Sequence, residues 1–368
     1  MVESRKCHRT SVLSCSVRLR FVLLAGIALA VETVGAQWPP EERLGPTATL
    51  AAAPAIQLTG EVDSNSPVIR DLIGGRPTTV VMTSFAGRPS RATGAALSTL
   101  TAARPVQITP LPEGGVWMEA VIPASDGTWY GFYHNERLAT ACGDTGKVVP
   151  RIGAARSTDQ GVTWTDLGIL IEASPSTYQC DTNNTYFVGG VGDLSALLDA
   201  SGQNVYIYFS QYGRMLRQQG IGVARFAWAD RDAPRGKLTV WSDGVWLPSG
   251  RRRVAMAIFP TTRAWHDEDN AADAFWGPSL HWNSYLQEYV MLVNRAKDES
   301  FKQEGVHISF SPRLDDPGAW SDPVKVYNGG RWYPQIVGLD AVGTDRMAGQ
   351  SARFFMFGRS DYIIRFEK

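Results

Sequence analysis

One pattern of hydrophobic and polar positions recurs five times along the chain. In each copy, a run rich in apolar, aromatic and β-branched residues ends in polar residues, which is typical of a strand that is buried over most of its length. The five runs are P-T-T-V-V-M-T-S-F from Pro77, T-W-Y-G-F-Y-H-N-E from Thr128, N-V-Y-I-Y-F-S-Q-Y from Asn204, E-Y-V-M-L-V-N-R-A from Glu288 and R-F-F-M-F-G-R-S-D from Arg353. The pattern predicts one strand of the same kind in five successive units.

Another apolar strand precedes each run, across a turn such as the Asp-Gly pair at 126–127. These preceding strands open on polar or aromatic residues and are V-D-S-N-S-P-V-I from Val62, W-M-E-A-V-I from Trp117, V-G-D-L-S-A-L-L from Val191, F-W-G-P-S-L-H-W from Phe275 and W-Y-P-Q-I-V-G-L from Trp332. In most units a third strand follows, and the third strands begin near Ala92, Ile152, Ile221 and Gly305. Each unit is therefore at least a hairpin.

Five antiparallel units in succession favour radial repetition over a sandwich, because each sheet must bury both faces against its neighbours. The sequence thus predicts an all-β fold, a five-bladed β-propeller, over residues 56–368. The last unit has no evident outer strand after residues 362–368, so a segment near 47–59 is a candidate to complete it and close the ring. We interpret residues 37–55 as an N-terminal linker or as this closing strand.

Residues 1–36 have the pattern of a signal peptide. Arg18 and Arg20 precede the apolar run 21–31, and the small residues V-G-A at 34–36 follow it. We therefore expect cleavage after this site and a secreted or periplasmic location. An uncleaved membrane anchor is the alternative.

The charge balance of the mature chain argues against two kinds of partner. The leader contains five basic and two acidic residues out of 36 of each in the whole chain, so 31 basic and 34 acidic residues remain after cleavage. Such a surface gives no electrostatic case for binding nucleic acid or an anionic membrane.

The sequence gives little sign of a cofactor. It has no CxxC, HExxH, P-loop or GxGxxG pattern, so zinc, nucleotide-phosphate and dinucleotide sites are not expected. Only Cys142 and Cys180 remain after cleavage, and in an exported protein they are a plausible disulfide. The charged segment 251–270 is interpreted as a loop that shapes the rim of the funnel, and a structural calcium ion there or at the centre is left open.

Residues at the openings of the first strands should converge, because these strands line the central funnel of a propeller. The candidates are three carboxylates, three tryptophans and two histidines: Asp63, Glu119, Asp193, Trp117, Trp276, Trp332, His134 and His281. Carboxylates can serve acid/base chemistry on a glycosidic bond, and indole faces can stack on sugar rings. The simpler alternative is structural, with Asp63 capping a turn and Asp193 binding backbone amides of a neighbouring blade.

This arrangement resembles the five-bladed glycoside hydrolase superfamily that includes arabinanases, β-xylosidases and invertases. The segments that carry the resemblance are V-D-S-N-S-P, W-Y-G-F-Y-H-N-E, G-V-G-D-L-S, F-W-G-P-S and W-Y-P-Q-I-V-G-L. They span nearly all of residues 56–368, and their order is more specific than any one of them. The resemblance implies a carbohydrate substrate and hydrolysis by two carboxylates in the funnel.

The resemblance also implies a role for each acid. Asp63 matches the first-blade Asp, which is the general base of inverting members and the nucleophile of retaining ones. The arabinanase-like pattern has an orienting Asp in the second blade and a general-acid Glu in the third, whereas this sequence has Glu119 and Asp193 at those positions. With the acids exchanged, Glu119 becomes the expected general acid and Asp193 the orienting carboxylate. Glu136, on the following strand, is the competing acid.

The stretch R-S-T-D-Q-G-V-T-W from Arg156 is similar to the Asp-box of sialidases, which is a structural motif on the outside of a propeller. Asp159 can accept hydrogen bonds from backbone amides, Gly161 can take positive φ and Trp164 can cover the turn. We interpret the stretch as scaffold. A sialidase is not expected, since only one such motif is present and no arginine cluster can be assigned.

Two functions of different classes follow from these patterns. One is an exported glycoside hydrolase that cleaves a plant or microbial oligo- or polysaccharide. The other is a catalytically inactive propeller that binds a carbohydrate or a protein in the same funnel, since the fold alone does not decide function. Transfer to phosphate in place of water is a further alternative, and the candidate residues for it are Arg70, Arg225, Arg295, Arg331 and Arg359.

Overall fold

The computed structural model describes residues 45–250, 255–265 and 271–368. The expected leader, the first part of the segment 37–55 and two stretches of the expected rim loop, 251–254 and 266–270, lie outside the described residues. The described residues all belong to one compact unit.

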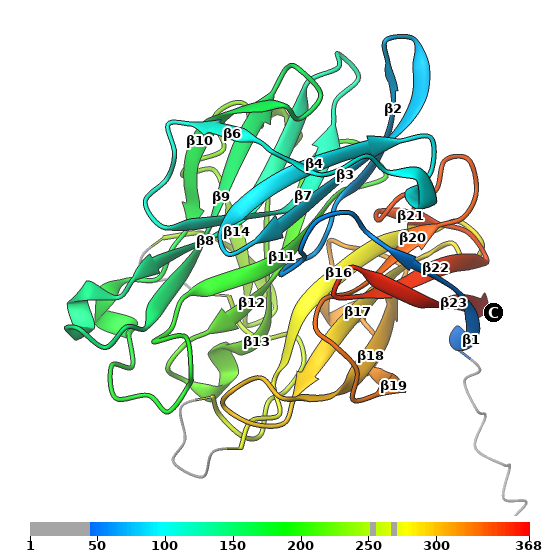
Figure 1. The fold of residues 1–368 in the computed structure, drawn as a ribbon. Helices are drawn as coiled ribbons and strands as arrows, with labels where there is room; N and C mark the ends of the chain where they lie inside the picture. Colours follow the sequence, from blue (N-terminus) through cyan, green and yellow to red (C-terminus); the bar gives the residue numbers. More distant parts are fainter. Residues whose placement is uncertain (1–44, 251–254, 266–270) are drawn as a thin grey trace, which may run out of the picture. The chain divides into compact units, whose positions relative to one another are not determined.

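The strands of the described residues form five sheets, which are the blades of a five-bladed β-propeller (Figure 1). Blade 1 contains β2 (Val68–Ile73), β3 (Arg76–Phe85), β4 (Arg88–Gly94) and β5 (Arg104–Pro105). Blade 2 contains β7 (Gly115–Pro123), β8 (Trp129–Leu138), β9 (Val148–Ser157), β10 (Thr163–Ile171) and β6 (Gln107–Thr109). Blade 3 contains β11 (Val191–Leu198), β12 (Asn204–Tyr212), β13 (Gln219–Ala227), β14 (Thr239–Ser242) and β15 (Val245–Pro248).

The remaining two blades use strands from distant parts of the chain. Blade 4 contains β16 (Phe275–Asn283), β17 (Glu288–Ala296), β18 (Gln303–Ser311) and β19 (Val324–Asn328), with β21 (Met347–Ala348) beside β16. Blade 5 contains β20 (Pro334–Gly338), β22 (Ser351–Met356), β23 (Arg359–Glu367) and β1 (Thr47–Gln57). The described short 3₁₀ turns are η1 (Leu97–Thr99), η2 (Thr140–Cys142), η3 (Pro175–Thr177), η4 (Leu216–Gln218), η5 (Trp228–Asp230) and η6 (Pro317–Ala319). In the described part of the chain, no helix has both the length and the apolar character that a membrane crossing needs.

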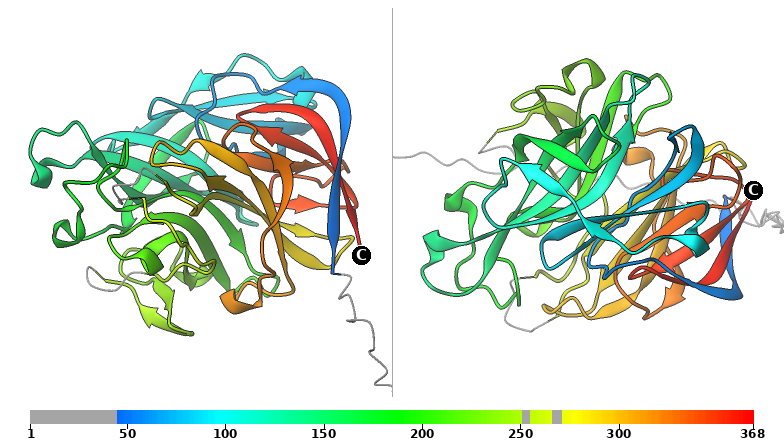
Figure 2. Two further views of the ribbon diagram at one scale, coloured as in Figure 1. Left: turned by 90° about the horizontal axis from the view of Figure 1, so that it is seen from below. Right: turned by 45° about the horizontal axis from the view of Figure 1, so that its top comes forward.

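The ring closes between the two ends of the described chain. Strand β1 pairs antiparallel with β23, from Thr47 opposite Glu367 to Gln57 opposite Arg359. Figures 1 and 2 show the two strands side by side, with β1 in blue and β23 in red. The N-terminal segment is therefore the outer strand of the last blade.

The blades pack face to face through large apolar side chains, because both faces of each sheet are covered by a neighbour. The rings of Phe132 and Phe226 lie 6.1 Å apart between blades 2 and 3. Tyr327 and Tyr362 make the corresponding contact between blades 4 and 5, with ring centres 5.5 Å apart. This packing explains why the middle strands are apolar on both sides.

Hydrogen bonds near the axis add to this packing. The Ser84 hydroxyl in blade 1 accepts a bond of 2.9 Å from the backbone N–H of Met118 in blade 2. The Ser210 hydroxyl in blade 3 accepts one of 2.8 Å from the backbone N–H of Gly277 in blade 4. Buried hydroxyls at the ends of strands β3 and β12 thus fix the position of the next blade's first strand.

The turn between β9 and β10 is built as the sequence suggests. The Asp159 carboxylate accepts bonds from the backbone N–H groups of Val162 and Thr163, and from the hydroxyl groups of Ser157 and Thr163. Trp164 is buried. Gln160 of the same stretch donates to the carboxylate of Asp71 at 3.2 Å and to the carbonyl of Leu72 at 3.1 Å, so the polar groups hold the turn and its contact with blade 1.

A disulfide joins Cys142 to Cys180. Cys142 ends the turn η2 after β8, and Cys180 lies in the connection between blades 2 and 3. The bond therefore ties that connection to its own preceding blade.

Candidate active site

A pocket of about 310 Å³ lies where the first strands of the blades meet. Every blade, or the connection that enters it, contributes to the lining. The lining residues are three carboxylates, one histidine and seven aromatic residues: Asp63, Glu136, Asp193, His134, Trp117, Tyr186, Phe187, Trp276, Phe301, Trp332 and Tyr333. Residues spread over 270 positions of the sequence thus share one site, as the propeller geometry requires.

Two β-bulges aim acidic side chains at the centre. Glu119 has no partner in the β7–β8 ladder, because Met118 pairs with Tyr133 while Ala120 already pairs with Phe132. Asp193 is the extra residue of a similar bulge in β11 and has a φ of 31°. A bulge changes the direction in which a side chain points, and bulges are common next to active sites. The positive φ of Asp193 is energetically costly for a residue other than glycine, and such strain is typical of functional sites.

Asp63 lies five residues before the start of β2, in the loop that enters blade 1. Its backbone N–H donates a bond of 2.7 Å to the carbonyl of Ser84. Burial, and then the nearby charge of Asp193, raise the pKa of Asp63 to about 6, while hydrogen bonds with Trp117 and Tyr333 oppose the shift. At neutral pH, Asp63 is therefore an ionised carboxylate of unusually high basicity.

The loop that carries Asp63 is fixed by two buried side-chain amides. The amide nitrogen of Asn65 donates to the carbonyls of Leu194 and Pro278, at 3.0 and 2.8 Å, and so reaches blades 3 and 4. Ser66 exchanges two hydrogen bonds with Gln335 of blade 5, at 2.6 and 2.8 Å. The loop is thereby held by three blades other than its own.

His134 is the centre of the acidic cluster. Its Nδ1 lies 3.4 Å from Oδ1 of Asp193 and 3.7 Å from Oε1 of Glu119, while its Nε2 lies 3.5 Å from Oε1 of Glu136. Burial alone would lower the pKa of His134, but the carboxylates of Asp193 and Glu119 beside it and the further negative charge of Glu136 raise the pKa well above its ordinary value. The carboxylates around the ring thus favour its protonated form, while the backbone N–H of Asp193, which donates to Nδ1 at 3.2 Å, favours the neutral form.

Glu119 lies behind this imidazole and does not line the pocket. Its side chain is buried, and its Oε2 accepts the backbone N–H of Leu194. Burial raises the pKa of Glu119 above its usual range, although the nearby His134 counteracts this. Its Oε1 has no hydrogen-bond partner among the described residues. A substrate in the pocket would meet His134, not Glu119.

Glu136 and Asp193 are the acids that share the pocket with Asp63. The side chain of Glu136 is 26% exposed, against 6% for Asp193, so Glu136 is the more accessible of the two. Burial raises the pKa of Glu136, while His134 lowers it. Asp193 is fixed at Oδ2 by the hydroxyl of Tyr212, which donates a bond of 2.8 Å.

The aromatic lining surrounds these acids with ring faces and edges. The ring centre of Trp117 lies 5.3 Å from that of His134, and Trp276 meets Trp332 edge to face at 5.5 Å. The indole N–H of Trp332 donates to the carbonyl of Phe301 at 2.9 Å. Tyr186 is 42% exposed at the mouth of the pocket, where its ring can contact a ligand.

Seven of the nine expected site residues line the pocket, and the structure adds four aromatic residues to them. Tyr333 directly follows Trp332, so the motif W-Y-P-Q already contained its signal. Tyr186 and Phe187 precede the Gly pair at 189–190, but lie in a connection whose course the sequence pattern does not predict. Phe301 is in the turn after β17 and has no comparable signal.

His281, which the sequence analysis expected in the site, does not line the pocket. Its ring is fully buried, 5.6 Å from the ring of Phe366 in blade 5, and is not among the pocket residues. Burial lowers the pKa of His281 to about 3, so the ring is neutral. It belongs to the packing between blades 4 and 5.

The cluster also has donor atoms that could approach a metal ion. One potential ligand atom from each of Glu119, His134 and Asp193 lies within 4.8 Å of the others. Calcium prefers oxygen ligands only, whereas an imidazole nitrogen suits transition metals better. The donor set therefore gives no specific support to the calcium ion considered from the sequence.

None of the five arginines considered for phosphate binding is among the described residues that line the pocket. Arg225 lies over the ring of Trp246, and Arg331 over that of Phe357. Arg295 pairs with Asp273. These three arginines therefore contact other parts of the fold.

The fold and this site together define a class: a five-bladed β-propeller with an acidic, aromatic pocket on its axis. No protein-family model and no curated protein matches the chain. Solved structures with a similar fold include an endo-arabinase from Bacteroides thetaiotaomicron, at 11% identity and a TM-score of 0.49, with 85% of this chain and 97% of that chain covered.

Two further solved structures are similar at the same level. A GH43 β-1,3-galactosidase solved with galactodeoxynojirimycin has 11% identity and a TM-score of 0.49, with 86% of this chain and 94% of that chain covered. A thermostable family-43 glycoside hydrolase has 11% identity and a TM-score of 0.47, with 84% and 92% covered. Because these identities and scores are low, a function for this chain has to be argued from its own pocket.

Proposed function

We propose that this protein is an exported glycoside hydrolase that cleaves glycosidic bonds in the central pocket. One observation carries the proposal: Asp63 and Glu136, two carboxylates of raised pKa, line the same aromatic pocket. Two carboxyl groups in one pocket, one to donate a proton and one to act as base or nucleophile, are what glycoside hydrolysis needs.

In this mechanism Glu136 is the general acid and Asp63 the base or nucleophile. Glu136 donates its proton to the glycosidic oxygen as the bond to the anomeric carbon breaks. Asp63 either removes a proton from the attacking water, which inverts the anomeric centre, or attacks the anomeric carbon itself, which retains it. Glu119, the acid favoured by the sequence pattern, is too deeply buried to reach a substrate oxygen.

The remaining acids set the electrostatics. His134 lies between Glu136 and the pair formed by Asp193 and Glu119, so its protonated form limits the mutual repulsion of the carboxylates. The negative charge of Asp193 in turn raises the pKa of Asp63 and of Glu136. Asp193 is therefore proposed as the residue that tunes both reacting groups.

The size of the pocket bears on the substrate. A volume of about 310 Å³ is at the small end for ligand pockets, which favours a chain end or a short oligosaccharide over the middle of a long polymer. Tyr186 and Trp332 are placed to stack on a sugar ring near the mouth. We propose a plant or microbial oligo- or polysaccharide as the source.

The first experiment tests for hydrolysis. Wild-type protein, Asp63→Asn and Glu136→Gln are assayed on chromogenic arabinosides, xylosides, fructosides, galactosides and mannosides. On the substrate that wild type cleaves, each variant should lose about 10²- to 10⁴-fold in kcat/KM. The exposed Glu367→Gln is the matched control and should keep wild-type activity. Equal rates in wild type and both pocket variants would refute hydrolysis in this pocket.

A second experiment separates the two roles. A leaving group of low pKa, such as dinitrophenolate, departs without protonation, so Glu136→Gln should retain most activity on a dinitrophenyl glycoside while losing it on the matching methyl glycoside. Asp63→Asn should lose activity on both. The opposite pattern would exchange the assignments of the two carboxylates.

A binding protein without catalysis is the second candidate. It is favoured by the burial of Glu119 and Asp193, which leaves few acids exposed to a substrate. Binding of a sugar, measured by quenching of tryptophan fluorescence, with no turnover of any substrate in the panel, would establish this function in place of hydrolysis.

Export is proposed from the leader pattern at 1–36 and agrees with the disulfide Cys142–Cys180, which persists in oxidising compartments. Expression of the full chain, fractionation and N-terminal sequencing test it. A mature chain that begins near Gln37 outside the cytoplasm is the expected result, and an intact N-terminus in the cytoplasm would contradict it.

A further inference from the structure

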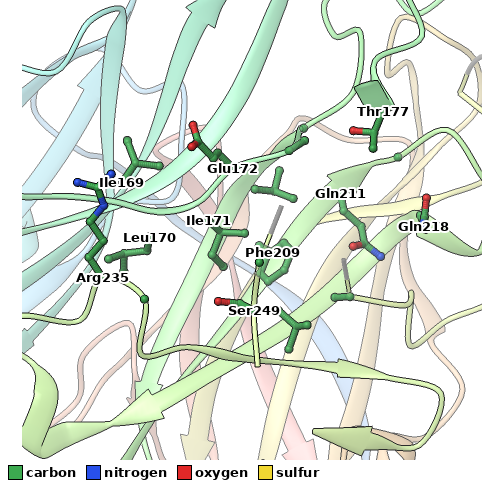
Figure 3. Close-up of a pocket in the computed structure, with 18 residues that line it drawn as sticks. Ile169, Leu170, Ile171, Glu172, Thr177, Phe209, Gln211, Gln218, Arg235 and Ser249 are labelled. Carbon is green, nitrogen blue, oxygen red and sulfur yellow. The ribbon is translucent and has the colours of Figure 1, made fainter. Parts of the chain in front are cut away.

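The connection between blades 2 and 3 supplies one wall of the central pocket. It runs from the end of β10 to the start of β11, and Figure 3 labels Glu172 and Thr177 in its first part. Its second part carries Tyr186 and Phe187, which line the central pocket. These two residues lie outside the regular strands and helices, so contacts other than a strand ladder must fix the position of their rings.

Asn184 builds the turn that places both rings. It is fully buried, and its Oδ1 accepts the backbone N–H groups of Tyr186, at 3.0 Å, and of Phe187, at 2.9 Å. The backbone N–H of Asn184 itself donates to the hydroxyl of Thr182 at 3.0 Å. An Asn side chain that accepts from backbone groups two and three residues on fixes the local path of the chain. The position of the two rings therefore depends on the position of Asn184.

Lys147 holds this turn from the side of blade 2. Its Nζ donates to the carbonyl of Thr182 at 2.5 Å and to that of Asn184 at 2.7 Å. Hydrogen bonds from a charged donor are about twice as strong as neutral ones. The next residue, Val148, begins β9, and its backbone N–H donates to the carbonyl of Tyr186 at 2.9 Å. The start of β9 thus grips the turn at three carbonyls, two of them through one ammonium group.

The other side of the turn rests on blade 4. The backbone N–H of Thr185 donates to the carbonyl of Glu299 at 3.2 Å, in the turn after β17. That turn also carries Phe301, whose ring centre lies 5.8 Å from that of Tyr186 and 5.6 Å from that of Phe187. The two pocket rings are therefore held between a lysine of blade 2 and an aromatic side chain of blade 4.

We propose that Lys147 is a positioning residue of the central pocket, which holds Tyr186 and Phe187 where a sugar ring of the substrate packs against them. Lys147 is not among the residues that line the pocket, so it acts through the turn at 182–187. Its effect on catalysis rests on the function proposed above, whereas its hold on the turn does not. Because Asp63 and Glu136 lie on other elements, loss of Lys147 should weaken substrate binding more than it slows the chemical step.

The first test is a double-mutant cycle on the glycoside of the panel that wild type cleaves fastest. Lys147→Met and Tyr186→Ala should each raise KM about three- to tenfold, the range that one aromatic contact provides, while kcat stays within about twofold. In the Tyr186→Ala background, Lys147→Met should add less than about twofold, since the ring it positions is gone. A full further rise of KM in the double variant, or a fall in kcat in place of a rise in KM, would overturn the proposal.

The second test follows the turn itself, without substrate, by hydrogen–deuterium exchange of peptides covering 182–188. In Lys147→Met the amides of Tyr186 and Phe187 should exchange about tenfold faster than in wild type, because the turn opens more often. Lys147→Arg keeps the charge and the donors and should stay closer to wild type. The exposed Lys237→Met is the matched control and should change neither exchange nor KM.

The exchange measurement separates failure of this inference from failure of the proposed function. Unchanged exchange in Lys147→Met would overturn the role of Lys147 even in an active enzyme. A protein that cleaves no glycoside would refute the proposed function, and the exchange result would still decide whether Lys147 holds the turn. If Lys147→Met does not fold, Lys147→Gln, with a shorter and uncharged side chain, takes its place with the same expected outcomes.

Discussion

Asn65 offers a direct test of how the propeller holds its centre. Its amide nitrogen bonds to two carbonyls, those of Leu194 and Pro278, which belong to different blades. Replacement by Leu, of nearly the same size, removes both bonds and also the amide oxygen, which has no partner among the described residues. At about 1 kcal/mol for each lost bond, plus part of the penalty for leaving a buried carbonyl short of a donor, the cost is about 2–3 kcal/mol.

This cost can be expressed as a melting temperature. With an unfolding entropy of about 2.1 cal/mol/K per residue over roughly 320 folded residues, a loss of 2–3 kcal/mol lowers Tm by about 3–5 °C. Asn65→Asp should be worse than Asn65→Leu, because it places an oxygen opposite two carbonyl oxygens. Differential scanning calorimetry at one scan rate measures both, and the exposed Asn328→Leu is the matched control.

Two results would refute the reasoning about Asn65. A Tm of Asn65→Leu within about 1 °C of wild type would mean that the two bonds do not stabilise the ring. A Tm of Asn65→Asp above that of Asn65→Leu would mean that the amide nitrogen does not face the two carbonyls.

Three further predictions concern titration, a turn and the disulfide. The pKa of Asp63 is about 6 in the folded protein against 3.8 without perturbation, so kcat/KM should fall below pH 6, where Asp63 becomes protonated. Burial of the ionised carboxylate also destabilises the fold above that pH, so Asp63→Asn should raise Tm at pH 8 but not at pH 4. Asp159→Ala should lower Tm without changing turnover, whereas the neighbouring Thr158→Ala should change neither; unchanged Tm with lost activity would contradict the scaffold role. Replacing Cys142 and Cys180 by Ser opens a loop with a sequence separation of 38 and should lower the free energy of unfolding by about 4 kcal/mol, measured by urea denaturation. An unchanged urea midpoint would refute this prediction.

The fold followed from the sequence because strand burial in a propeller is repetitive. Each middle strand is covered on both faces, so it reads as a continuous apolar run, as in β8 and β12. The closing strand β1 was harder to identify, since its alanine-rich sequence has few large apolar residues and most of its side chains are exposed. β1 pairs with β23 because β23 would otherwise be an unpaired edge strand of blade 5, and the hydrophobic pattern of β1 itself does not indicate this partner.

The candidate site was predictable in composition but not in the role of each acid. Alternation along a strand cannot tell which face Glu119 takes, because a bulge at that residue shifts the register by one position. A further bulge between Trp276 and Ser279 in β16 has the same effect on His281, which faces blade 5. Tyr186 and Phe187 depend on a long connection whose path is fixed by tertiary contacts.

The pairing of β1 with β23 has a consequence for biosynthesis. The strand that seals blade 5 is among the first parts of the propeller to leave the ribosome, while its partner, the nine residues of β23, is among the last. Until that partner emerges, the early strand has nothing to pair with and the acids of the centre have no complete wall around them. A nascent chain that lacks β23 is therefore an open array of sheets, and the ring closes only once β23 has emerged.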